Sequence, residues 1–146
     1  MVNRKTHPHK FFTGEEKEQI VRAIRAAEAQ TSGEIRVYLE RKAKKDFMSH
    51  AQKVFEKLGM TRTKHRNGVL IYFSLVDHRF AILGDRSIHE KVGQNFWQET
   101  ALTMSNYFSQ DQFSEGLEAG ISQIGARLKE YFPHERGDIN ELPDAV

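Results

Sequence analysis

The longest apolar run in the chain covers residues 69–76, and Ser74 is its only polar member. The run shows no alternation of apolar and polar positions, so it predicts a strand buried on both faces, at the centre of a sheet. Residues 34–40 do alternate, which predicts a strand with one well-buried face. A third apolar run, residues 80–83, follows after a short polar break, and we expect it to form a hairpin with the central strand.

Four segments carry apolar residues at helical spacing, at about residues 14–30, 47–58, 88–108 and 112–132. Each is preceded by a residue that can cap a helix N-terminus, and in two cases a glutamate follows three positions later. The predicted caps are Thr13 with Glu16, Asp46, Ser87 with Glu90, and Asp111. We expect Gly93 to break or bend the third helix.

The order of these elements predicts the fold class. The helix at 47–58 connects the first strand to the central strand, and such a crossover makes the two strands parallel. The hairpin makes the third strand antiparallel to the central one. We therefore expect an α/β fold, a three-layer α/β/α sandwich around a small mixed β-sheet. The domain should span residues 13–133, between a basic lead at 1–12 and a flexible tail at 134–146.

Composition narrows the classes of function. The chain has 146 residues, of which 38% are apolar and 29% charged, as in one globular domain. It has no cysteine, which excludes disulfides, zinc–thiolate sites and thiol nucleophiles. We find no signal peptide and no run of transmembrane length, so we expect a soluble, cytoplasmic protein.

The predicted topology gathers polar residues at one edge of the sheet, because the first two strands begin where the third ends. Hard oxygen ligands of this kind suit Ca²⁺ or Mg²⁺. Glu34 and Asp85 would supply charge, and Asn67 and Thr31 neutral oxygens. The residues expected at the edge are Thr31, Ser32, Gly33, Glu34, Asn67, Gly68, Gly84, Asp85 and Ser87.

The same residues permit a catalytic interpretation. A bound cation can act as a Lewis acid in the attack of water on a phosphate, with Asp85 holding the cation and His89 transferring a proton. The alternative is that the hydroxyls and Asp85 are ordinary turn and capping residues and that Glu34 is a strand residue facing solvent. The sequence contains no phosphate-binding loop, dinucleotide fingerprint or nucleophile elbow.

The net charge of +2 gives no strong overall field. The loop at 62–66 contains four basic residues and can be a phosphate contact or a solvated loop. No aromatic residues lie between these charges to stack on bases, so the pattern does not favour nucleic acid.

Three segments carry a family resemblance. Residues 27–37 (AEAQTSGEIRV), together with 67–72 (NGVLIY) and 80–88 (FAILGDRSI), resemble the motifs of the TPM-domain family. The resemblance covers about residues 13–133 and implies an α/β/α sandwich, binding of a divalent cation such as calcium, and, for some members, acid phosphatase activity. Many members also carry a signal peptide and a membrane anchor, so this chain resembles the short, free-standing branch.

Two functions follow as hypotheses. The first is a domain that binds a divalent cation and acts on a phosphorylated substrate. The second is a non-catalytic module that binds a protein partner, with a structural metal or none. The sequence names neither the substrate nor the oligomeric state.

Overall fold

All seven residues of the central strand, β2 (Gly68–Ser74), are buried. The computed structural model describes residues 6–44 and 46–134. In this range β2 lies between β1 (Glu34–Glu40), which is parallel to it, and β3 (Arg79–Gly84), which is antiparallel. The predicted central strand, the hairpin and the parallel crossover are all confirmed.

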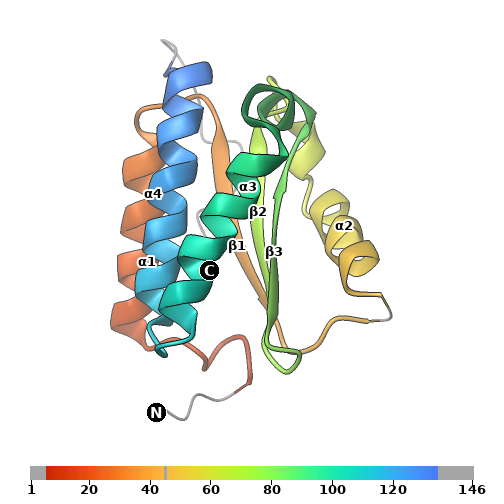
Figure 1. Ribbon diagram of the computed structural model, residues 1–146, viewed down its shortest axis with the longest axis vertical. Helices are drawn as coiled ribbons and strands as arrows, with labels where there is room; N and C mark the ends of the chain where they lie inside the picture. The colour runs from red at the N-terminus through yellow and green to blue at the C-terminus, as the bar shows by residue number, and fades with distance from the viewer. Residues whose placement is uncertain (1–5, 45, 135–146) are drawn as a thin grey trace.

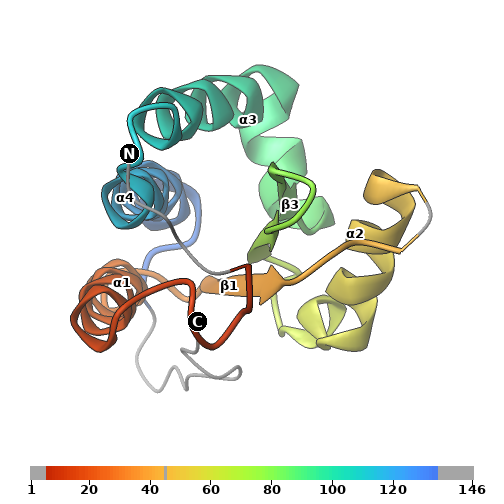
Figure 2. The same ribbon diagram turned by 90° about the horizontal axis from the view of Figure 1, so that it is seen from below.

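Helices cover both faces of the sheet, which confirms the predicted three layers (Figures 1 and 2). One face packs against α1 (Gly14–Glu28), α3 (Arg86–Phe108) and α4 (Phe113–Tyr131). The other face packs against α2 (Phe47–Lys57) and a short 3-10 helix, η1 (Met60–Arg62).

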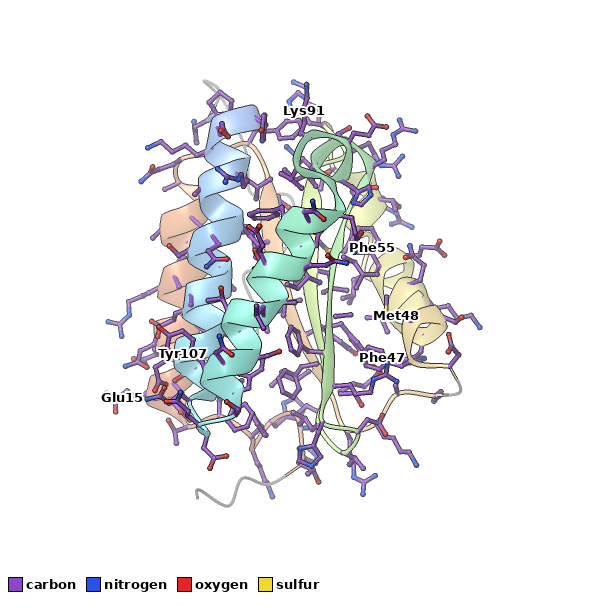
Figure 3. All side chains as sticks on the ribbon, viewed as in Figure 1. Glu15, Phe47, Met48, Phe55, Lys91 and Tyr107 are labelled. Atoms are coloured by element: carbon purple, nitrogen blue, oxygen red, sulfur yellow. The ribbon has the colours of Figure 1, made fainter. Side chains whose placement is uncertain are left out.

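The alternation of side chains along the strands divides the core into two clusters. Val69 and Ile71 belong to the larger cluster, on the face covered by three helices, whereas Leu70 and Tyr72 belong to the smaller one under α2. Four α2 side chains are buried in the smaller cluster, Phe47, Ala51, Val54 and Phe55, and Figure 3 labels the two phenylalanines. The side chains on the α2 face of the sheet therefore form a core cluster of their own, separated by the sheet from the larger cluster.

The ends of the domain are only partly described. In the basic lead, Phe11 and Phe12 are buried in the larger cluster and attach this segment to the core. Residues 1–5 and the greater part of the predicted tail, 135–146, lie outside the described residues.

Two of the four predicted helix caps are confirmed. Thr13 and Glu16 form a reciprocal capping box at the start of α1. The Asp46 carboxylate accepts a hydrogen bond of 3.0 Å from the Ser49 N–H at the start of α2.

The other two caps are corrected. Asp85, not Ser87, caps α3, and its carboxylate accepts a 2.8 Å bond from the Arg86 N–H. Asp85 has the extended backbone of a cap, while Ser87 already lies in the first helical turn. Asp111 does not cap α4, because its positive φ of 59° places it in the turn before Gln112.

Two glycines, Gly93 inside α3 and Gly84 at the end of β3, are needed for the local structure. Gly93 has φ 76° and ψ 170°, so it interrupts α3 as predicted. A Cβ on Gly84 would lie 2.4 Å from the Trp97 ring, so only glycine allows Trp97 to pack against the end of β3.

We predict that Gly84→Ala lowers the free energy of unfolding by ~1–3 kcal/mol, since the rigid Trp97 ring must move to accept the methyl group. Gly14→Ala is the matched control, because its new Cβ meets no atom within 4 Å. Urea unfolding of both variants checks this. Equal stability of the two variants would contradict the proposed packing.

Candidate functional site

Glu34, Gly68 and Asp85 lie in a row across one edge of the sheet. Glu34 is the register partner of Gly68, and the Asp85 N–H donates a 2.9 Å hydrogen bond to the Gly68 carbonyl. The three positions span two strand spacings, roughly 10 Å. The structure thus brings the two carboxylates to one edge, where the topology predicted them.

Both carboxylates belong to the α2 face of the sheet. Glu34 precedes Ile35, which faces the larger cluster, so alternation directs Glu34 to the opposite face. Asp85 contacts Arg66, in the loop that follows η1. Between them Gly68 has no side chain, and the Met60 carbonyl oxygen lies 3.0 Å from where its Cβ would be. Both residues are buried: 3% of the surface of Glu34 and 5% of the surface of Asp85 is exposed to solvent.

The Asp85 carboxylate accepts three hydrogen bonds. The Arg66 guanidinium donates two hydrogen bonds to it, of 2.6 Å from Nε and 2.9 Å from Nη2. This pairing raises the pKa of Arg66, which therefore stays charged. The same carboxylate also caps α3.

The backbone holds Arg66 in an unusual conformation for a residue with a side chain, with φ at 51°. Its carbonyl oxygen accepts a 3.1 Å hydrogen bond from the Ser87 N–H. Sequence reasoning treated Arg66 as one of several loop cations. Nothing in the sequence signals its pairing, because the left-handed turn that aims the side chain forms only in the folded loop.

Asn67 is 99% buried and only partly satisfied. Its side-chain nitrogen donates to the Ser32 hydroxyl at 3.3 Å, and its backbone N–H donates to the Thr63 hydroxyl at 3.2 Å. Its Oδ1 atom accepts no hydrogen bond from residues 6–44 or 46–134. A buried acceptor left in this way costs about 1–3 kcal/mol, so Asn67 has one oxygen available to a ligand.

Thr31 is bound into the fold. Its hydroxyl donates to the carbonyl oxygens of Leu128 and Phe132 and accepts a 3.0 Å bond from the Gly33 N–H. These bonds join the end of α4 to the start of β1. The threonine oxygen would have to give up part of this network to bind a cation.

His89 is exposed, and its ring is hydrogen-bonded to Trp97 and not to Glu34 or Asp85. Its Nδ1 atom accepts a 2.9 Å hydrogen bond from the Trp97 indole N–H, so a neutral ring carries its proton on Nε2. Trp97 belongs to the larger cluster, on the face opposite Glu34. No described hydrogen bond joins the His89 ring to either carboxylate.

The edge therefore offers two carboxylates and one unused amide oxygen to a hard cation, but no ready-made site. In the part of the chain that the structure describes, no group of three or more His, Asp or Glu side chains is arranged to hold a metal ion. Carboxylate and amide oxygens are the ligand types that Ca²⁺ prefers, and in this structure Arg66 occupies the Asp85 carboxylate.

One further property concerns the length and apolar character of the helices. None of the helices within the described residues combines the length and the apolar character needed to cross a membrane.

Comparison with known proteins agrees with this architecture. The family model of the TPM domain matches residues 6–127. The chain is similar to the BA42 protein of the psychrophilic bacterium Bizionia argentinensis, whose structure was determined by NMR, with 44% identity, a TM-score of 0.87 and 94% of each chain covered. A search of curated proteins gives no match. Because the family model covers most of its length, this chain belongs to the TPM-domain family.

Proposed function

We propose that this domain binds a divalent cation at the edge formed by β1, β2 and β3. The observation that carries the proposal is the Asn67 Oδ1 atom, a buried acceptor with no partner among the described residues. It belongs to the residue before Gly68, which lies between Glu34 and Asp85. The three residues occupy neighbouring backbone positions, and two nearly buried carboxylates with an acceptor that lacks a hydrogen bond are groups that a hard cation would stabilise.

Calcium suits the proposed site better than magnesium. Ca²⁺ accepts six to eight oxygens in flexible geometry, whereas Mg²⁺ needs a near-ideal octahedron. The ligands come from separate segments, and the Met60 carbonyl near Gly68 can add a backbone oxygen. With only two carboxylates, the dissociation constant should lie in the weak range, roughly 10⁻⁴–10⁻³ M.

Arg66 is the internal competitor of this cation. Its guanidinium makes two hydrogen bonds to Asp85, in the place where a cation ligand is needed. Binding must therefore break these bonds and leave Arg66 to solvent. The exchange keeps Asp85 neutralised in both states, which avoids an unpaired buried charge.

Catalysis is an extension of the same proposal. The cation would polarise a phosphate monoester for attack by water, and His89, as the imidazolium formed once its Nδ1 atom releases the Trp97 N–H, would donate a proton to the leaving oxygen. The alternative function is a protein-interaction module in which the cation, if bound, only stabilises the edge. The exposed position of His89 permits the first, and its hydrogen bond to Trp97 supports a structural role as well.

Asp85→Asn should weaken calcium binding about tenfold or more, because a charged ligand becomes neutral while asparagine still caps α3. Calorimetric titration of Ca²⁺ measures the effect. Glu90→Gln, an exposed carboxylate on the same helix, is the control and should bind as the unaltered protein does. If Ca²⁺ gives no heat of binding with the unaltered protein, the cation proposal is wrong.

Arg66→Asn should tighten calcium binding ~10-fold, since the competing charge is lost and asparagine tolerates the left-handed backbone. The control is Arg62→Gln, an exposed cation in η1 that is not bound to Asp85. The rise in melting temperature with added Ca²⁺ reports both affinities. Unchanged affinity in Arg66→Asn would show that the guanidinium and the cation do not compete.

The phosphatase extension predicts turnover of p-nitrophenyl phosphate that depends on added Ca²⁺ or Mg²⁺. His89→Gln should reduce this turnover by ~10²–10⁴-fold and leave calcium affinity unchanged. Calcium binding without any turnover, at high protein concentration and across acidic pH, would favour the interaction module.

A further inference from the structure

A second polar cluster lies at the other end of β1. Glu40, the last residue of that strand, accepts two hydrogen bonds on one oxygen. The Tyr72 hydroxyl donates one, of 2.5 Å, and the other joins His50 Nε2 to the same Oε1 at 2.6 Å. The carboxylate thus joins side chains from β2 and α2, and the proposed cation site does not include any of the three residues.

The cluster is held rigidly. Tyr72 is fully buried, and its burial, followed by the hydrogen bond to Glu40, raises the pKa of its hydroxyl well above the usual value. The hydroxyl therefore remains a donor, and Glu40 remains its acceptor. Because His50 shares that acceptor, its ring is fixed in orientation, and its side chain is only 14% exposed.

A groove of about 590 Å³ runs between this end of β1 and α2. Glu40 and His50 line it, together with the apolar surfaces of Tyr38 and Val54. Its volume is in the range that accommodates small organic ligands. The Tyr38 ring stacks on Tyr72, at 6.4 Å between centroids and 15° between planes, so it presents a supported flat surface.

The lining of the groove holds more cationic than anionic side chains, three lysines against the carboxylates of Glu40 and Asp46. Three lysines line it, Lys44, Lys53 and Lys57, and none forms an ion pair with any residue that the structure describes. Both carboxylates of the lining form hydrogen bonds with groups other than the lysines. Glu40 accepts from the tyrosine and faces the histidine, and Asp46 caps α2.

We propose that this groove binds a small organic phosphate, whose flat ring lies against Tyr38 and whose phosphate group is held by Lys53 and Lys57. A dianionic phosphate is the complement of unpaired ammonium groups, and an aromatic ring is the complement of the tyrosine face. The groove is separated from the Glu34 and Asp85 edge by the length of β1, roughly 20 Å. Binding here is therefore independent of the cation proposal.

Phenyl phosphate is the probe, followed by amide chemical shifts in two-dimensional ¹⁵N NMR. We expect saturable shifts confined to residues 38–44 and 49–58, with a dissociation constant of ~1 mM or lower. Phenol and inorganic phosphate separate the two parts of the ligand, and each alone should bind more weakly. Equal affinity for inorganic phosphate would overturn the role of the ring.

Charge-neutral variants test the phosphate contact. Lys53→Gln with Lys57→Gln should weaken phenyl phosphate binding at least about fivefold, since both ammonium groups are lost. Lys129→Gln, an exposed lysine on α4, is the control and should have no effect. The variants are on exposed positions, so folding is retained and can be confirmed from the same spectra.

Two outcomes overturn the proposal. The first is the absence of saturable shifts in residues 38–58. The second is shifts centred on residues 31–34 and 85–89, which would assign the phosphate to the sheet edge and would support phosphatase chemistry there. Calcium titration gives a separate readout, so failure of this groove and failure of the cation site are distinguishable.

Discussion

The burial of β2 on both faces is the constraint on which the rest of this structure depends. A strand of seven buried residues needs cover on two sides, and it cannot be an edge strand. The chain meets this need by placing α2 on one face and three helices on the other. The crossover through α2 makes β1 parallel to β2, and the hairpin makes β3 antiparallel, so the starts of β1 and β2 lie beside the end of β3.

One consequence is that Asp85 has several roles at once. It follows β3, caps α3 and pairs with Arg66, and in the proposed cation-bound state it would exchange that arginine for a metal ion. A carboxylate at a helix N-terminus is already stabilised by the helix dipole. It can therefore remain charged and nearly buried while its cationic partner changes, which a carboxylate elsewhere in the core could not do at similar cost.

The two ends of β1 differ in chemistry. Glu34 begins the strand at an edge with buried acidic groups, and Glu40 ends it beside a groove lined with lysines that form no ion pair within residues 6–44 and 46–134. Both glutamates belong to the α2 face, at opposite ends of the same alternating pattern. This face is covered by α2 and the short η1 rather than by three helices, and β1 turns Glu34 and Glu40 toward it while turning Ile35, Val37 and Leu39 toward the three helices.

Much of the fold could be predicted from the sequence. The unbroken apolar run and the alternating run specified the central and flanking strands, and the Thr13 and Asp46 caps were predicted correctly. These features depend on local periodicity and on contacts within one turn of helix. Because the topology follows from element order, the meeting of Glu34 with Asp85 at one edge was predictable too.

The tertiary structure determined which partner each polar group has. Ser87 and Asp85 are both good capping residues, and only the path of the chain out of β3 determines which one has the extended backbone. Arg66 reaches Asp85 across 19 positions through a left-handed turn, and Tyr72, Glu40 and His50 meet from three elements. Such pairings join distant positions and depend on ångström-scale geometry, so the sequence by itself determined the elements and their order, while packing determined the chemistry of the site.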